Sequence, residues 1–272
     1  MQVTLLGTGD TAGTPVPRCD CPTCTRARET GQTRSRFSVH VQNETTGESL
    51  LVDASPDFRQ QFLDTDVPLP EEAVITHVHF DHLDGLGNVY RLLDELPVHA
   101  ANETDPELDE SVAETVRRRY DYLRQVEVCP QAPFAPFEAA GFEVTLVPVE
   151  HPPLLSYGLR VEGDGATLAL TGDTSFDIPE RSQAVLRDAD LLLADAIVPA
   201  SMCEHHPMGG RHETEDGVPR TFGTKHMTRR GAIDMAERLA ASARRLVHVS
   251  HRYPVEEAFD PELAVDGERI QL

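Results

Sequence analysis

The segment from Thr76 to His82, which reads THVHFDH, constrains this chain more than any other feature. It places three imidazoles and one carboxylate within six residues, and these groups are first-choice ligands for borderline divalent metals. Residues 72–76 before it read as a short buried strand, and an amphipathic stretch follows Gly87. The segment therefore lies on a strand-to-helix turn, where its side chains can form two separate ligand sets. A surface cluster of histidines, the alternative, accounts less well for this spacing.

The segment resembles the HxHxDH motif of the metallo-β-lactamase superfamily. Each further motif of that family has a counterpart at the end of an apolar run, in family order, at Asp53, His151, Asp173 and His248. The resemblance implies an α/β fold of the αββα four-layer sandwich type. It also implies that residues 1–272 form one metallo-β-lactamase-like hydrolase domain.

The resemblance further implies two divalent metals, zinc, manganese or nickel, in one active site. The implied ligands of the first metal are His77, His79 and His151. Those of the second are Asp81, His82 and His248, with Asp173 between the metals and Asp53 in support. Asp81 is also expected to act in catalysis. Two such cations about 3.5–4 Å apart polarise a phosphoryl or acyl oxygen and hold a hydroxide as nucleophile.

A second cluster contains three thiols within six residues, Cys19, Cys21 and Cys24, which is one ligand short of a closed tetrahedral zinc site. His251, three residues after His248, is the candidate fourth ligand. The combination resembles a narrower branch of the family, the phosphoribosyl 1,2-cyclic phosphate phosphodiesterases, and implies one structural zinc. Reduced buried thiols and a redox pair are the alternatives.

His226 stands directly before an expected helix over residues 229–243. Its place before the last metal-ligand motif resembles that of the histidine that protonates the leaving oxygen in phosphodiesterase members. An imidazolium beside two cations needs a carboxylate partner, and Asp195 and Glu204 are the candidates. Alternatively, Thr228 caps the helix and His226 is incidental.

Two less specific features each have two interpretations. His205, His206 and His212 lie among glycines, which suits a lid over the pocket or an ordinary surface loop. The run Arg117–Arg119 suits a contact to a substrate phosphate, but a solvated helix face is the more frequent origin of such a run.

The chain has a net charge of −22, and Lys225 is its only lysine. Acidic residues are spread along the whole sequence, a pattern that looks like adaptation to a high-salt cytoplasm, where salt screens self-repulsion. The same charge weighs against nucleic-acid binding, which needs Lys and Arg against phosphates. The absence of a signal peptide or a membrane-length apolar run, together with the clustered cysteines, predicts a cytoplasmic protein without a membrane partner.

Periodicity predicts two further helices, near residues 106–125 and 178–187, and a loop over Pro130–Pro136. Strands are expected over residues 3–6, 37–41, 50–52, 74–76, 142–147, 157–161, 167–170, 191–194 and 246–249.

The leading functional hypothesis is a metal-dependent phosphodiesterase that opens a small cyclic phosphate ester, with phosphoribosyl 1,2-cyclic phosphate as the candidate substrate. The expected partners are this small molecule and, as a candidate assembly, a second copy of the chain in a homodimer. The rivals are a tRNA 3′-processing endonuclease, an acyl hydrolase such as a lactonase or thioesterase, and a protein of pyrroloquinoline quinone biosynthesis.

Overall fold

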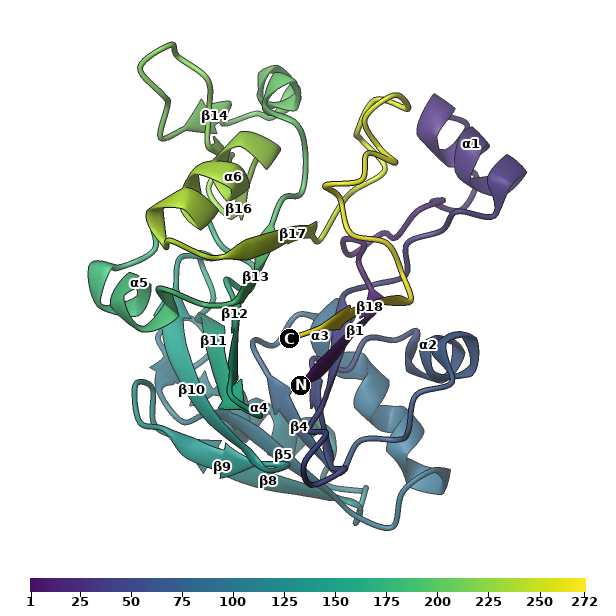
Figure 1. The fold of residues 1–272 in the computed structure, drawn as a ribbon, viewed down its shortest axis with the longest axis vertical. Coiled ribbons are helices and arrows are strands. Elements are labelled where there is room, and N and C mark those ends of the chain that lie inside the picture. Colours follow the sequence, from purple (N-terminus) through teal and green to yellow (C-terminus); the bar gives the residue numbers. More distant parts are fainter.

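The structure, a computed structural model of residues 1–272, confirms the expected αββα sandwich. Two β-sheets lie in the middle of the molecule and helices cover their outer sides (Figure 1). The first sheet has the order β18-β1-β2-β3-β4-β5-β8. Its strands are β1 Gln2–Gly7, β2 Ser38–Gln42, β3 Ser49–Val52, β4 Glu72–Ile75, β5 Leu96–Ala101, β8 Val126–Gln131 and β18 Glu268–Gln271.

The second sheet has the order β17-β13-β12-β11-β10-β9. Its strands are β9 Phe137–Ala139, β10 Phe142–Val149, β11 Ser156–Gly163, β12 Ala166–Leu170, β13 Leu191–Asp195 and β17 Ala243–Val247. Strands β3 and β13, each parallel to at least one neighbour, are buried along their whole length. Their near-continuous apolar sequences follow from this burial, because helices or the other sheet cover both of their faces.

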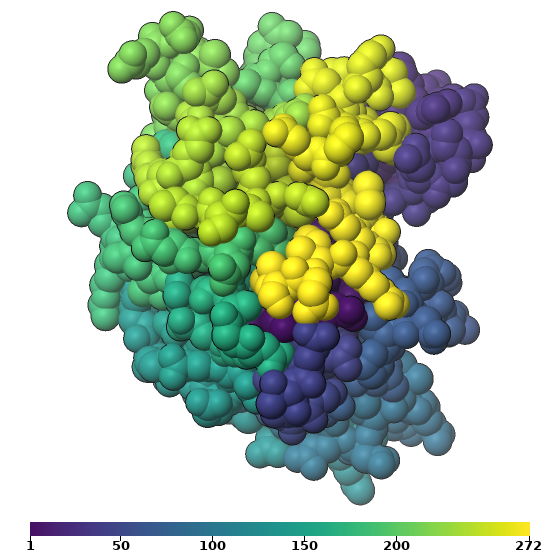
Figure 2. All heavy atoms as spheres, viewed as in Figure 1, coloured from purple at the N-terminus to yellow at the C-terminus, as the bar shows by residue number.

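Helices α2 Phe58–Thr65 and α4 Val112–Arg119 pack on the first sheet, and α5 Glu180–Leu186 and α6 Arg229–Arg238 on the second. Helix α1 Pro22–Thr30 projects beside the C-terminal segment (Figures 1 and 2). The short elements are α3 Phe80–Leu83, the 3₁₀ helices η1 Asp84–Arg91 and η2 Ala200–His205, the hairpin β6 Thr104–Asp105 and β7 Glu110–Ser111, and the small sheet of β14 Gly210–Arg211, β15 Thr221–Phe222 and β16 His226–Met227. None of the helices combines the length and hydrophobicity that a bilayer span requires.

Two expected helices are shorter than the periodicity predicts. The helix expected over residues 106–125 is only α4, because a capping box between Ser111 and Glu114 sets its start and the β6–β7 hairpin occupies the residues before it. Helix α6 stops at Arg238 instead of residue 243, since Ala240 takes a left-handed conformation and the chain enters β17 at Ala243. Local periodicity does not register such cap and turn geometry.

Two boundaries in the sheets also differ from expectation. The strand expected over residues 246–249 is β17, which ends at Val247, so that His248 lies beyond the strand with φ +59°. The loop expected over Pro130–Pro136 begins later, because Pro130 and Gln131 belong to β8. Pro130 is tolerated there because β8 is an edge strand of its sheet.

Gly85 tests how tightly the start of η1, which follows the HxHxDH motif, packs against Ala54 and Ser55 after β3. A side chain at this position would overlap the carbonyl oxygens of Ser55 and Ala54, whereas Gly87, in the same helix η1, has open space around it. We expect Gly85→Ala to lower the free energy of unfolding by roughly 2 kcal/mol through overpacking, and Gly87→Ala to change it by less than about 0.5 kcal/mol. Denaturant unfolding of both variants measures this, and equal midpoints would contradict the packing described.

Candidate active site

The candidate site lies where strands of both sheets end. Its residues follow β3 (Asp53), β4 (His77, His79, Asp81 and His82), β10 (His151), β12 (Asp173) and β17 (His248). The carboxyl ends of neighbouring parallel strands meet at one edge of a sheet, and this is why groups far apart in the sequence converge. The structure brings together every side chain of the two predicted ligand sets.

Three imidazole nitrogens meet in the first set. Nε2 of His77 lies 3.0 Å from Nδ1 of His79, which lies 3.3 Å from Nε2 of His151. A neutral imidazole has one N–H, and the backbone carbonyl of Lys225 already accepts from Nδ1 of His151 at 3.1 Å. Nitrogens bound to one tetrahedral zinc at about 2.1 Å lie about 3.4 Å apart. The spacing therefore fits a shared cation better than hydrogen bonds between the rings.

The ligand atoms of the second set also converge without hydrogen bonds between them. Nε2 of His82 lies 3.6 Å from Oδ2 of Asp81, and Nε2 of His248 lies 3.8 Å from the same oxygen. Both imidazole nitrogens are buried and have no hydrogen-bond partner. Oδ2 of Asp173 is 3.3 Å from each of them and 3.8 Å from Nε2 of His77. This oxygen faces both sets, which is the placement of a carboxylate that could bridge two metals.

The charges at the site call for a positive partner. Burial opposes protonation of His82, but the carboxylates of Asp173, Asp53 and Asp81 outweigh it and raise the pKa of His82 well above its ordinary value. Burial likewise opposes protonation of His248, and the carboxylates around it, led by Asp173, raise its pKa in the same way. A divalent cation would supply the positive charge that these carboxylates attract, and would bind the neutral form of each imidazole.

Asp53 orders the loop that carries the HxHxDH motif. Its carboxylate accepts from the backbone N–H and the hydroxyl of Thr76, both at 2.8 Å, and lies 2.6 Å from Nδ1 of His82. The last contact turns Nε2 of His82 toward the metal set, which is the usual work of a carboxylate behind a histidine ligand. Asp53 (φ +59°) and His248 (φ +59°) are both left-handed, and such strain collects at functional positions.

His226 has the carboxylate partner that the sequence predicts, and of the two candidates it is Asp195. Nδ1 of His226 lies 2.9 Å from Oδ2 of Asp195, while Glu204 lies beside His205 instead. The His226 ring stacks on His248 with centroids 5.0 Å apart and an interplanar angle of 15°. Thr228 does cap α6, because its side chain accepts from the N–H of Gly231. The role of His226 stays a prediction.

The cysteine cluster forms a separate candidate metal site. Nδ1 of His251 lies 3.6 Å from Sγ of Cys19 and 3.5 Å from Sγ of Cys21, and Cys24 completes a set whose ligand atoms all lie within 4.8 Å of one another. Sγ of Cys21 also caps α1 by accepting from the N–H of Cys24. Burial raises the pKa of the Cys24 thiol to about 12, so a bound metal would have to displace that proton.

The two less specific features lie in ordinary surroundings. Arg118 pairs with Glu110 and Arg119 with Asp84, as on a solvated helix face. The loop with His205 and His212 is held by the small sheet β14–β16.

Sequence reasoning missed two contributors, the Lys225 carbonyl that holds His151 and the Thr76 hydroxyl, which lies 3.1 Å from Nδ1 of His77. A carbonyl leaves no side-chain signal. Thr76, however, directly precedes His77 in the sequence, so its contact with the His77 ring could have been predicted from its position.

Comparison with known proteins places the chain in a family. The model of the β-lactamase superfamily domain matches residues 48–249. An octanoyltransferase of Porphyromonas gingivalis (strain ATCC BAA-308 / W83) is 26% identical over 266 residues, 94% of this chain and 47% of that protein. The chain thus spans about half the length of that relative. Coenzyme PQQ synthesis protein B of Rhizobium meliloti (strain 1021) is 26% identical over 326 residues, 100% of this chain and 98% of that protein.

Among solved structures, a diphosphatase from the PhnP family superposes with a TM-score of 0.78 at 28% sequence identity, covering 100% of this chain and 97% of that one. The order of the motifs, the sandwich fold and the family match over residues 48–249 all indicate the same superfamily. The chain belongs to the metallo-β-lactamase superfamily, whose fold binds divalent metals.

Proposed function

We propose that this chain is a dinuclear metal-dependent phosphodiesterase that opens a small cyclic phosphate ester, with phosphoribosyl 1,2-cyclic phosphate as the candidate. The observation that carries the proposal is the His226–Asp195 pair, at 2.9 Å, placed against the two ligand sets. A proton donor at this position is what cleavage of a phosphate ester with an alkoxide leaving group requires.

The proposed ligand sets are those in which the nitrogen and oxygen atoms converge. One metal is assigned to His77, His79 and His151, the other to Asp81, His82 and His248, and Asp173 to both. A structural zinc is assigned to Cys19, Cys21, Cys24 and His251. When bound, the two active-site cations supply Lewis acidity and hydroxide at neutral pH.

The chain's own residues orient the ligands and move the proton. Asp53 and the Lys225 carbonyl fix the rings of His82 and His151. Asp195 holds Nδ1 of His226, which leaves Nε2 for the substrate. As the nucleophilic oxygen bonds to phosphorus and the ester P–O bond breaks, Nε2 of His226 gives its proton to the leaving oxygen, and Asp195 stabilises the imidazolium that precedes this transfer.

Two observations support a small phosphodiester over other substrates. The 28% identity to the PhnP-family diphosphatase extends along both chains, so the likeness is more than one of fold. The net charge of −22 disfavours a tRNA backbone, which binds through many Lys and Arg contacts. The proposal includes a cytoplasmic location and a homodimer.

One rival has an observation in its favour. The full-length similarity to coenzyme PQQ synthesis protein B favours a role in the biosynthesis of that cofactor. For a protein of that biosynthesis that is not a hydrolase, we would expect a single metal, and the similarity alone does not separate this case from a hydrolase. The complete second ligand set around Asp173 argues for two metals in the active site. Metal content and turnover separate the two.

Metal content tests the ligand assignment. We expect three divalent metals per chain by mass spectrometry of the purified protein, one fewer in His82→Ala, and one fewer in Cys21→Ser. Cys129→Ser is the matched control, because Cys129 belongs to no ligand set, and it should keep all three. Cys21→Ser should also unfold at lower temperature, because a structural zinc stabilises the folded state. A single metal in the unmodified chain would favour the rival.

His226 is tested by its effect on rate. We expect His226→Ala to lower kcat by about 10²–10⁴-fold, since the leaving oxygen loses its proton donor, while the metal count stays unchanged. His205→Ala, which changes an exposed histidine beside Glu204, is the control and should keep its activity. An unchanged kcat in His226→Ala would exclude this residue as the acid.

The substrate class is tested with a panel. With manganese, zinc or nickel, we expect turnover of bis(p-nitrophenyl) phosphate and of phosphoribosyl 1,2-cyclic phosphate, and none of lactones or thioesters. The walls around the metals, and not the metals themselves, set this preference. Turnover of a thioester without phosphodiester turnover would contradict the proposal, and clean 3′ trimming of tRNA would favour the endonuclease.

A further inference from the structure

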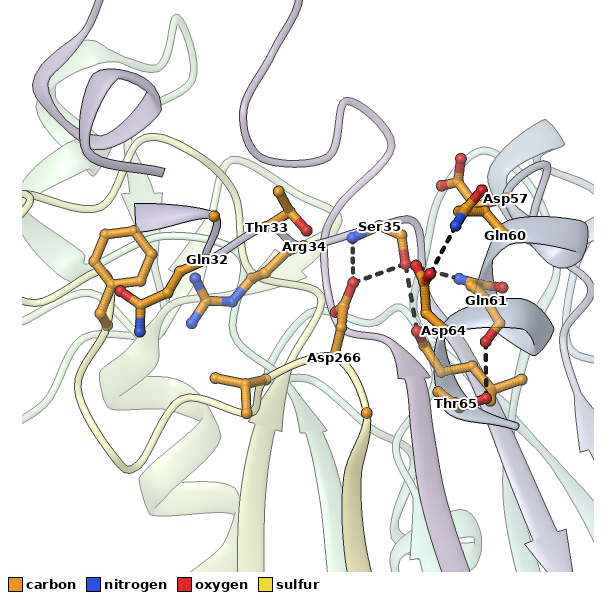
Figure 3. Close-up of a pocket in the computed structure, with 15 residues that line it drawn as sticks. Gln32, Thr33, Arg34, Ser35, Asp57, Gln60, Gln61, Asp64, Thr65 and Asp266 are labelled. Carbon is orange, nitrogen blue, oxygen red and sulfur yellow. Dashed lines mark hydrogen bonds between the residues drawn. The ribbon is translucent and has the colours of Figure 1, made fainter. Parts of the chain in front are cut away.

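Lys225 carries a positive charge that the chain itself leaves unpaired. It is the only lysine in a sequence with 46 acidic residues, yet its ammonium forms no ion pair and no hydrogen bond with the protein. Arg34 shows the contrast: it lies in a pocket of about 480 Å³ (Figure 3), where the charge of the Asp266 carboxylate acts on it. Among so many acidic residues, a half-buried cation without a carboxylate beside it points to a partner outside the chain.

The ammonium of Lys225 lies at the mouth of the candidate active site. All the side chains of the two ligand sets are buried except that of His79, which therefore marks the side of the site that faces solvent. Phe80, the next residue, is 48% exposed. Burial lowers the pKa of His79, and the positive charge of Lys225 acts on it in the same direction. The ammonium is thus close to the open side of the site.

The backbone on both sides of Lys225 is held in place. Lys225 stands in the turn between β15 and β16, and its carbonyl accepts from Nδ1 of His151 at 3.1 Å. Before it, the N–H of Gly223 donates to the Gly209 carbonyl at 2.9 Å. After it, a carboxylate at the end of β13 holds the ring of His226. Only the side chain of Lys225 is left to order when it meets a ligand, which limits the entropy lost on binding.

The position of Lys225 assigns it to a group other than the reacting phosphate. Nδ1 of His151 faces the Lys225 carbonyl and Nε2 faces the first ligand set, so an imidazole separates this backbone from the proposed metal. With both proposed cations bound, the ammonium would be repelled unless an anion lay against it. A phosphodiester has one negative charge, which the two cations would take up. Lys225 is then left for a second anionic group of the substrate.

We propose that Lys225 binds a second, unreactive phosphate group of the substrate and so selects phosphodiesters whose alcohol part carries a phosphomonoester. The inference rests on the proposed phosphodiesterase function, and it makes Lys225 a residue that determines specificity. An ammonium on a flexible stem binds phosphate as a point charge, without the fixed two-bond geometry of an arginine. The 5-phosphate of phosphoribosyl 1,2-cyclic phosphate is a group of this kind.

Steady-state kinetics of the metal-loaded, full-length protein test the proposal with two substrates that differ only in the second phosphate, phosphoribosyl 1,2-cyclic phosphate and ribose 1,2-cyclic phosphate. We expect the unmodified chain to favour the first in kcat/KM by about 10–100-fold, the usual effect of a hydrogen bond to a charged group. Lys225→Gln should lose this preference, through KM more than through kcat, because the second phosphate is bound alike in the ground state and the transition state.

Two further variants separate the charge of Lys225 from its place in the turn. Lys225→Arg keeps the positive charge and should keep most of the preference. Arg124→Gln is the matched control: Arg124 is exposed and precedes β8, so it lies at the edge of the first sheet opposite the active site, and the full preference should persist. An equal preference in Lys225→Gln and Arg124→Gln would overturn the proposal, as would a Lys225→Gln variant whose kcat/KM falls equally for both substrates.

Binding measurements separate this inference from the proposed function. In a His226→Ala background, calorimetry should give the phosphorylated substrate a Kd about 10–100-fold lower than that of ribose 1,2-cyclic phosphate, and Lys225→Gln should remove the difference. If the unmodified chain turns over neither substrate, the proposed function is wrong, and calorimetry still decides the role of Lys225. If it turns over both with the same kcat/KM, only the inference is wrong. No binding of either substrate would overturn both.

Discussion

The approach of three imidazole nitrogens, those of His77, His79 and His151, to 3.0–3.3 Å is the contact on which the rest of the active site depends. Neutral rings have too few N–H groups to bond one another in this arrangement, and protonated rings repel. The neighbouring Nε2 atoms of His82 and His248 are buried without hydrogen-bond partners, and the carboxylates that surround them attract a positive charge. The proposed pair of cations would satisfy both sets of groups, and metal binding would then be coupled to the stability of this region.

The structure around the active site holds the ligand side chains in this arrangement. Asp53 joins the ends of β3 and β4 by bonding both Thr76 and His82, and the left-handed backbone at Asp53 and His248 turns the chain sharply out of its strand. Such conformations persist only where neighbours determine them. Gly85 contributes by letting η1 approach the backbone of Ala54 and Ser55 closely. The loop is therefore fixed by hydrogen bonds and packing contacts on the side away from the two ligand sets.

The side chains that the sequence assigns to the ligand sets do converge in the structure, because they carry their signal in a fixed order and at the ends of apolar runs. The sequence predicts the sheet strands for the same reason, since buried parallel strands read as continuous apolar runs. It predicts helix ends poorly. The Ser111 capping box and the left-handed Ala240 each depend on a few residues, whereas a hydrophobic period is only detected over a longer window. Long-range contacts such as the hydrogen bond from Arg34 to the Ala264 carbonyl could not be predicted, because the two residues are 230 positions apart in the sequence.

The charge of the chain bears on how the active site meets its substrate. A molecule with a net charge of −22 repels an anionic substrate at long range, and salt at high concentration shortens that repulsion to a few ångströms. Inside this distance, local groups decide. At the active site the two proposed divalent cations would outweigh the carboxylates of Asp81 and Asp173, and Lys225, the only lysine, directly precedes His226. An acidic surface of this kind therefore restricts anion binding to places where positive charge is concentrated, as it would be at a metal-loaded active site.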